Sequence, residues 1–184
     1  MDKGKETQVN RNFVIVFAVL LTFVWAAQAQ TANPLSAEAK QAYTGVKNNL
    51  LRAADKMPEA DYSFKPVPEI RSWGELIAHT ADVTARNCGT VKGEQKPVNA
   101  ATKKTKAEIA AALQESFDIC DGVYDSLTDA VALQTVAGRG GGQVSKLSVL
   151  SGNLAHLNEE YGYAAVYLRL KNIVPPSSDR AMGR

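Results

Sequence analysis

The stretch that decides the fold is SKLSVLSGNLAHLNEEYGYAAVYLRLK, residues 145–171. Its apolar residues recur at steps of three and four, which predicts one long amphipathic helix. Pro175 and Pro176 follow it and prevent further helix. The predicted inner face of this helix consists of Leu147, Leu150, Leu154, Leu157, Tyr161, Ala164, Ala165 and Leu168.

Three more amphipathic stretches precede this helix. The first spans about residues 36–56, and the second and third begin after Ser72 and Thr105. Each of these two caps has a glutamate three positions later, the pattern of a capping box. Tyr62 and Phe64 lie in a proline-rich connection and are expected to cover one end of the helices. With no convincing alternating strand pattern, four such helices predict an all-α four-helix bundle.

The connection before the last helix, residues 130–143, contains the glycine-rich run Gly138-Arg139-Gly140-Gly141-Gly142. A phosphate-binding loop would continue with Gly-Lys-Ser/Thr between a strand and a helix. Neither feature is present, so the sequence favours a flexible connection over nucleotide binding.

Residues 1–29 have the layout of a secretory signal peptide. Basic residues precede an apolar run, residues 13–27, and Ala27-Gln28-Ala29 forms a small-x-small cleavage site. The rival interpretation is an uncleaved membrane anchor, because the apolar run approaches the length that spans a bilayer. Cleavage would leave one domain, residues 30–184, in the periplasm or outside the cell, with no contact to the membrane.

The formal net charge of the whole chain is only +2, and no run of basic residues stands out. Proteins that bind nucleic acids normally present a basic face or stripe, so this class of partner is excluded. A homodimer is compatible with a bundle that has apolar surface to spare, although no specific patch can be named.

Cys88 and Cys120 are the only cysteines. In an oxidising compartment they could join two neighbouring helices through a disulfide. They could equally be two small buried hydrophobic residues. The sequence does not supply the Cα separation that decides between these alternatives.

The chain has two histidines, and each lies on the inner or flanking face of a predicted helix. His79 belongs to the second helix and His156 to the last, with Glu160 one turn later. Two imidazoles and a carboxylate form a ligand set that Zn, Ni or Fe(II) accepts. Glu159, three residues from His156, is a competing ligand. The alternative is that both histidines only pack.

Two stretches, DKMPEADYSFKPVPEIRSWGELIAHTADV (55–83) and GNLAHLNEEYGYAAVYLRLKNIVPPSS (152–178), resemble the hallmark segments of the DinB-like superfamily. The resemblance implies a four-helix bundle that holds a divalent metal through three histidines. The three positions fall on His79, His156 and Glu160. The family pattern Asn-Glu-His-Tyr-Gly reads Asn-Glu-Glu-Tyr-Gly here, so a glutamate replaces the third histidine.

Some members of the superfamily act as metal-dependent transferases or isomerases with low-molecular-weight thiols, while many have no known activity. The resemblance therefore leads to two hypotheses. The first is an exported metal-dependent thiol transferase or hydrolase of a small substrate, with no catalytic acid or base assigned beyond the nearby Glu159 and Tyr161. The second is a non-catalytic domain that binds a ligand or protein, with a degenerate metal site. In that case Glu160 should reach solvent or pair with a cation such as Arg86 or Arg169.

Overall fold

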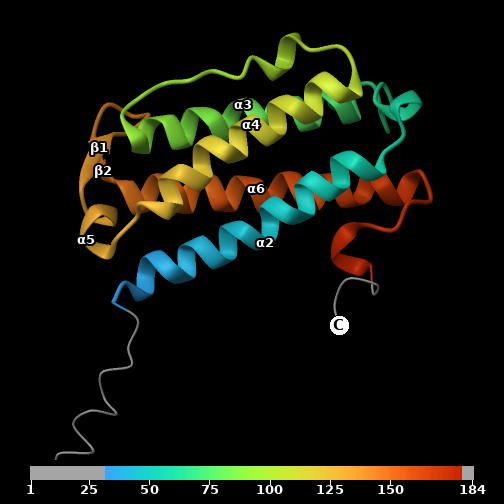
Figure 1. The fold of residues 1–184 in the computed structure, drawn as a ribbon. Helices are drawn as coiled ribbons and strands as arrows, with labels where there is room; N and C mark the ends of the chain where they lie inside the picture. Colours follow the sequence, from blue (N-terminus) through green and yellow to red (C-terminus); the bar gives the residue numbers. More distant parts are fainter. Residues whose placement is uncertain (1–31, 180–184) are drawn as a thin grey trace, which may run out of the picture. The chain divides into compact units, whose positions relative to one another are not determined.

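The computed structural model describes residues 32–179 (Figure 1). Four long helices dominate it, as the sequence predicts: α2 (Pro34–Lys56), α3 (Trp73–Lys92), α4 (Lys106–Asp125) and α6 (Lys146–Leu170). Within these residues no helix is long and apolar enough to cross a membrane. The predicted signal peptide, residues 1–29, lies outside the described part of the chain.

Short elements connect the long helices. They are the 3-10 turns η1 (Glu59–Asp61), η2 (Ala100–Thr102) and η3 (Pro176–Ser178), the one-turn helix α5 (Asp129–Ala132), and the strands β1 (Thr135–Ala137) and β2 (Gln143–Ser145). Both predicted capping boxes are formed. At the start of α3 the Ser72 backbone N–H donates to Glu75 Oε2 at 2.7 Å, and the Glu75 backbone N–H donates to Ser72 Oγ at 3.3 Å. Thr105 and Glu108 exchange the same bonds at the start of α4.

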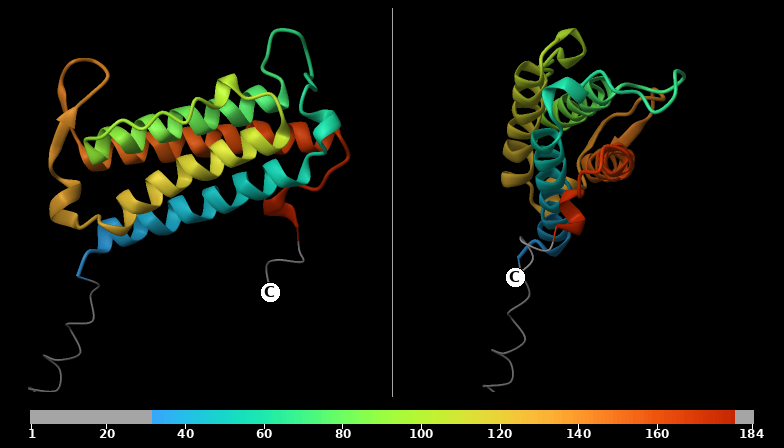
Figure 2. Two further views of the ribbon diagram at one scale, coloured as in Figure 1. Left: turned by 45° about the horizontal axis from the view of Figure 1, so that its top comes forward. Right: turned by 90° about the vertical axis from the view of Figure 1, so that its right-hand side faces the viewer.

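α3 packs along both α4 and α6 (Figure 2). α2 is attached to α4 by Tyr43, whose ring stacks on Tyr124 at a centroid distance of 4.2 Å. The Tyr43 hydroxyl also donates to Asp121 Oδ1 at 2.9 Å. These contacts place one continuous apolar core among the four helices.

The proline-rich connection covers one end of this core, as predicted. Tyr62 is buried and meets Trp73 edge to face, with ring centroids 6.4 Å apart. Phe64 meets Tyr167 of α6 in the same way at 6.2 Å. The Tyr62 hydroxyl donates to the Ala54 carbonyl at 2.8 Å, which secures the connection to the end of α2.

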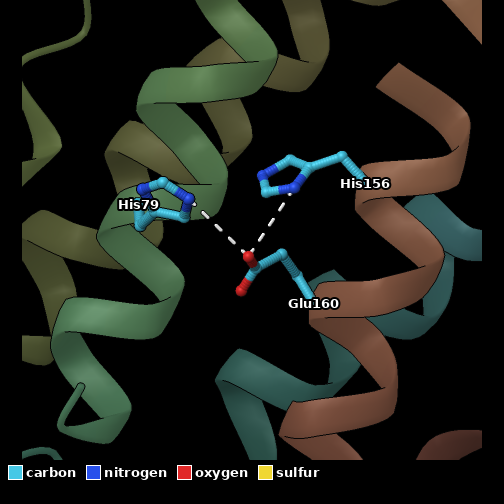
Figure 3. A group of neighbouring side chains, drawn as sticks. All are labelled: His79, His156 and Glu160. Atoms are coloured by element: carbon cyan, nitrogen blue, oxygen red, sulfur yellow. Dashed lines mark ion pairs between the residues drawn. The ribbon is translucent and has the colours of Figure 1, made fainter. Parts of the chain in front are cut away.

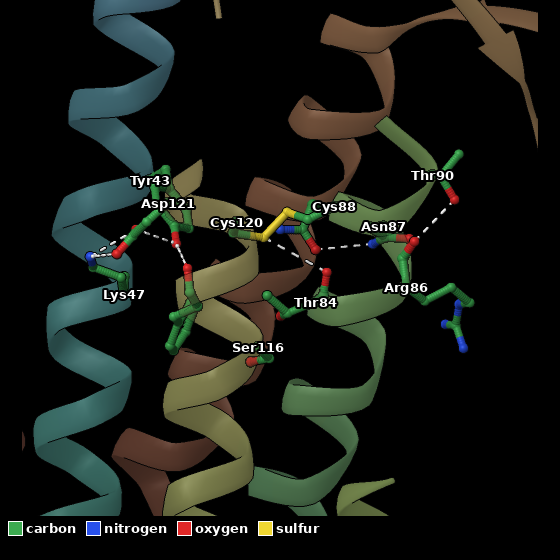
Figure 4. Close-up of a disulfide and its surroundings, with 12 residues drawn as sticks. Tyr43, Lys47, Thr84, Arg86, Asn87, Cys88, Thr90, Ser116, Cys120 and Asp121 are labelled. Atoms are coloured by element: carbon green, nitrogen blue, oxygen red, sulfur yellow. Dashed lines mark hydrogen bonds and ion pairs between the residues drawn. A yellow bond between two sulfur atoms is a disulfide. The ribbon is translucent and has the colours of Figure 1, made fainter. Parts of the chain in front are cut away.

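A disulfide between Cys88 of α3 and Cys120 of α4 decides the alternative that the sequence left open (Figure 4). Both residues are fully buried, and their Cα atoms are 5.2 Å apart. The bridge therefore joins two neighbouring helices inside the core.

The connection between α4 and α6 contains a one-turn helix and a hairpin that the sequence did not predict, so the expectation of an all-α fold was wrong at this point. After α5, β1 and β2 pair antiparallel, with Val136 opposite Val144. The glycine-rich run forms the tip, where the Gly138 N–H donates to the Gly142 carbonyl at 2.7 Å and Gly141 has φ of 81°. Strands of three residues are too short to show an alternating pattern, so the sequence could not reveal this hairpin. The bundle is accordingly helical with one small two-stranded sheet.

The inner face of α6 also differs from the prediction. Its buried residues are Leu150, Asn153, Leu157, Glu160, Ala164, Tyr167 and Leu168. Leu147, Leu154, Tyr161 and Ala165, which apolarity placed on this face, are only partly buried. The helix thus turns two polar residues, Asn153 and Glu160, toward the interior. A buried polar side chain destabilises the fold unless it has a partner. Asn153 and Glu160, the buried polar track of α6, are therefore candidates for binding a ligand.

Candidate metal centre

The structure brings the three predicted ligands together between α3 and α6 (Figure 3). His79 Nε2 lies 3.6 Å from Glu160 Oε1, and His156 Nδ1 lies 3.7 Å from the same oxygen. One ligand atom from each of the three residues lies within 4.8 Å of the other two. The imidazole rings meet edge to face at 5.2 Å. A helical turn brings His156 and Glu160 onto one side of α6, and packing of α3 supplies His79.

The surroundings lower the pKa of both histidines and raise the pKa of Glu160. Burial lowers the pKa of His79 and of His156. The positive charge of Arg71 lowers the pKa of His79 further, whereas the negative charge of Glu159 opposes the effect of burial on His156. Burial raises the pKa of Glu160, although the charge of Arg71 opposes this effect. The lowered pKa values favour uncharged imidazoles, which weakens both contacts to Glu160 that Figure 3 draws as ion pairs.

Two atoms of the cluster are buried without a hydrogen-bond partner. They are Nε2 of His156 and Oε2 of Glu160, whose residue is only 3% exposed. Glu160 therefore neither reaches solvent nor forms an ion pair with Arg86 or Arg169, the outcomes expected only if it no longer binds a metal. Arg169 lies on the exposed side of α6, where it donates to Ser178 Oγ at 3.0 Å. Neither His156 Nε2 nor Glu160 Oε2 takes part in the two contacts of 3.6 and 3.7 Å. Buried polar atoms without a partner are rare and costly.

The residues present fit a divalent ion. Three ligands about 2.1 Å from one tetrahedral ion lie about 3.4 Å from one another, close to the two contacts measured here. Neutral imidazoles and an ionised carboxylate are the forms that bind metal. Glu159, the competing ligand, is exposed and instead accepts a hydrogen bond from Tyr163 at 3.0 Å. His79, His156 and Glu160 would therefore hold the ion.

Two cavities border the cluster. One, of about 570 Å³, lies against α3, the hairpin and α6 and is lined by both histidines. The other, of about 760 Å³, lies beside the connection before α3 and is lined by His79 but not by His156. A small molecule in the first cavity has direct access to both imidazoles. This arrangement matches catalytic metal sites, in which three protein ligands leave one position for water or substrate.

The nearby groups considered as acid or base make hydrogen bonds to residues outside the cluster. The Tyr161 hydroxyl donates to Ser177 Oγ and accepts from the Ser177 N–H, both at 2.8 Å. Glu159 is occupied by Tyr163, as described above. Sequence reasoning missed Asn87, Arg139 and Asn153, which line the cavity of about 570 Å³. Of these three, only Asn153 carries a signal in the sequence, because an asparagine is unusual on the buried face of a helix.

The sequence model of the DinB superfamily matches residues 42–164 of this chain, which include all three candidate ligands. The chain belongs to the DinB superfamily. Among curated proteins, none matches it. Two DinB-like crystal structures share its fold. The one from Bacillus subtilis is 17% identical with a TM-score of 0.63, and the match covers 78% of this chain and 99% of that one. The one from Bacillus cereus is 15% identical with a TM-score of 0.63, covering 75% and 93%.

The DinB fold also occurs in a protein of known chemistry, a mycothiol-dependent maleylpyruvate isomerase. It is 16% identical to this chain, with a TM-score of 0.57. The match covers 72% of this chain but only 60% of the isomerase, which is the longer protein. This similarity establishes a shared fold for the DinB domain.

Proposed function

We propose that this protein binds one divalent metal ion through His79, His156 and Glu160 and uses it to act on a small molecule. The observation that carries the proposal is that His79, His156 and Glu160 each bring one possible ligand atom within 4.8 Å of the other two, beside a cavity that both histidines line. The chemistry fits a metal-dependent transferase or hydrolase, with a thiol as one class of substrate. The mycothiol-dependent isomerase supports this class, since its fold is shared.

The bound ion would supply Lewis acidity to a coordinated thiol, water or carbonyl. Glu160 tunes this acidity, because an anionic ligand in place of a neutral imidazole lowers the net charge of the site from +2 to +1. It also favours harder ions, such as Fe(II), relative to a site of three histidines. The aliphatic parts of α3 and α6 around the cluster exclude water from its inner side, while the cavity keeps one side open.

The test is the metal content of the protein, purified without an affinity tag or a chelator. We expect about one Zn, Ni or Fe ion per chain, lost in His79→Ala and in Glu160→Gln. Glu159→Gln is the matched control. Glu159 is the residue before Glu160, its side chain is exposed, and the substitution removes the same charge. Glu160→His should bind metal more tightly by restoring three imidazoles. If neither wild type nor Glu160→His binds any of the three metals on reconstitution, the metal site is disproved.

One observation favours a second candidate, a non-catalytic ligand-binding or protein-binding domain with a degenerate metal site. Glu159 and Tyr161, the nearest groups considered as acid or base, are both engaged elsewhere. A protein that binds no metal yet binds small molecules in the cavity would support this candidate.

We also propose that the mature chain acts outside the cytoplasm. The pattern of residues 1–29 supports export, and the disulfide Cys88–Cys120 is of the kind that persists in oxidising compartments. Export would separate the protein from chromosomal DNA, in line with the absence of a basic stripe. Amino-terminal sequencing of the protein recovered from culture medium or periplasm should begin at Gln30. An amino terminus at Met1 in the membrane fraction would favour the anchor.

A further inference from the structure

The cavity that contains both histidines also contains two arginines and no carboxylate. Arg86 comes from α3 and Arg139 from the tip of the hairpin. His79 and Arg86 are two helical turns apart, so they lie on the same face of α3, about 10 Å apart along its axis. The other cavity is different, because four carboxylates line it together with its basic residues: Glu59, Glu69, Glu75 and Asp82.

The guanidinium groups of these two arginines lack a carboxylate partner within residues 32–179. Arg139 Nη2 donates only to Asn87 Oδ1, at 3.5 Å, and Arg86 uses its backbone carbonyl rather than its side chain. Some cations of the bundle do have a carboxylate partner, as Lys47 has in Asp121 at 2.8 Å. Two unpaired guanidinium groups beside one cavity produce a positive potential that attracts anions.

A buried amide provides an independent sign of a missing ligand. Asn153 of α6 is fully buried and lines the cavity. Its Oδ1 accepts from Asn87 Nδ2 at 3.0 Å, while its own Nδ2 has no partner. Asn87 thus links the amide of Asn153 to Arg139, and Arg86 and Asn87 lie side by side on α3 (Figure 4). A donor left unpaired in a buried site is costly unless a ligand accepts its hydrogen bond.

We propose that this cavity is a binding site for a small carboxylate, with Arg86 and Arg139 as its charged ligands and Asn153 as a further donor. A guanidinium group matches a carboxylate through paired, charge-assisted hydrogen bonds. The substrate class of the proposed metal site would then be a small organic acid whose far end reaches the histidine cluster. Only the reaction of this acid rests on the proposed function; its binding does not. The volume of about 570 Å³ is in the usual range of small-molecule sites.

The residues on α6 leave room for such a ligand. Gly152 lines the cavity, and a Cβ atom added there would meet nothing within 4 Å. A larger side chain at this position would enter open space without disturbing the core. Gly152→Leu should therefore obstruct the ligand while leaving every charge and every candidate metal ligand in place.

The experiment is an NMR titration of the full mature protein with succinate, performed once with chelator and once after loading with zinc. The side-chain amide signals of Asn87 and Asn153 report on the cavity. We expect succinate to shift them and its neutral analogue succinamide not to. Arg86→Gln and Arg139→Gln should each weaken succinate binding roughly tenfold, as expected for loss of one charge-assisted contact, and Gly152→Leu should prevent binding.

Two charge-matched controls locate the site. Arg169 lies outside both cavities, and Arg71 lines only the cavity of about 760 Å³. Neither Arg169→Gln nor Arg71→Gln should therefore change the affinity for succinate by more than about twofold. The proposal is overturned if succinate binds all variants equally, if only Arg71→Gln weakens it, or if succinamide binds as well as succinate. Succinate binding to the chelated protein that depends on Arg86 and Arg139 would establish the anion site even if the metal analysis failed.

Discussion

Replacement of Glu160 by glutamine should stabilise the metal-free protein. The wild-type carboxylate is 3% exposed, touches two histidines with lowered pKa values and has one oxygen without a partner. A glutamine amide has the same shape, carries no charge and can donate to the unprotonated nitrogen of either imidazole. Relief of one unsatisfied buried group corresponds to about 1–2 kcal/mol in the free energy of unfolding. For a domain of this size that raises the melting temperature by roughly 2–8 °C.

Metal should reverse the order of the two proteins. A ligand at a concentration one hundred times its dissociation constant stabilises the folded state by about 2.7 kcal/mol. Wild type should therefore gain roughly 5–11 °C on addition of the metal, whereas Glu160→Gln, which lacks the anionic ligand, should gain much less. The assay is thermal unfolding followed by circular dichroism, with chelator and with each candidate metal, in the absence of reductant.

The pH dependence isolates the carboxylate. Because burial raises the pKa of Glu160, its ionised form destabilises the fold above the ordinary glutamate value of about 4.3. That cost disappears as the pH falls through the raised pKa toward this ordinary value. The advantage of Glu160→Gln in chelator should therefore be largest at neutral pH and shrink toward pH ~4. If the variant is less stable than wild type in chelator, or if metal stabilises both equally, the account of Glu160 is refuted.

The remaining predictions concern the scaffold. Cys88→Ser with Cys120→Ser, or reduction of wild type, should cost roughly 3–4 kcal/mol for a loop of this length, measured by denaturant unfolding; equal stability with and without reductant would contradict it. Ser72→Ala should cost about 1 kcal/mol by removing the cap of α3, while Ser63→Ala, an exposed serine in the preceding connection, should stay within about 0.5 kcal/mol. The hydrogen bond from the Ser72 N–H lowers the pKa of Glu75, so its contribution to stability is present above pH ~4.3 and is lost as the pH falls through the lowered pKa. Acid unfolding of Glu75→Ala should therefore be less steep than that of wild type below this pH, and identical acid profiles would show that the capping box contributes nothing.

The local signals in the sequence were sufficient for the helices. Ser72 and Thr105 predict where two helices begin, because a capping box depends only on residues three apart. Both boxes are formed. Two of the candidate metal ligands could also be predicted, since His156 and Glu160 share one helical face whatever the helix packs against. His79 was found from its place on the inner or flanking face of the second predicted helix, and the resemblance pointed to the same residue.

Interactions between distant elements were not accessible in this way. The pairing of Cys88 with Cys120 depends on the relative height of α3 and α4, which no local pattern encodes. Arg139 reaches the cavity only because a hairpin of two three-residue strands folds back beside α6. The inner face of α6 was misjudged because apolarity ranks Leu154 and Tyr161 above Asn153 and Glu160, while the packing with α3 buries the polar pair.

The disulfide supports the helix that packs against the buried polar residues of α6, Asn153 and Glu160. Asn153 and Glu160 weaken the interface between α3 and α6, because each exposes an unpartnered polar atom to the core. The Cys88–Cys120 bridge fixes α3 to α4 immediately beside Asn87, the residue that contacts Asn153. The bridge thus fixes α3 to α4 covalently next to the polar contact that α3 makes with α6. A bundle built in this way can keep Arg86, Asn87 and the histidine cluster in place before any ligand binds, which lowers the ordering cost of binding.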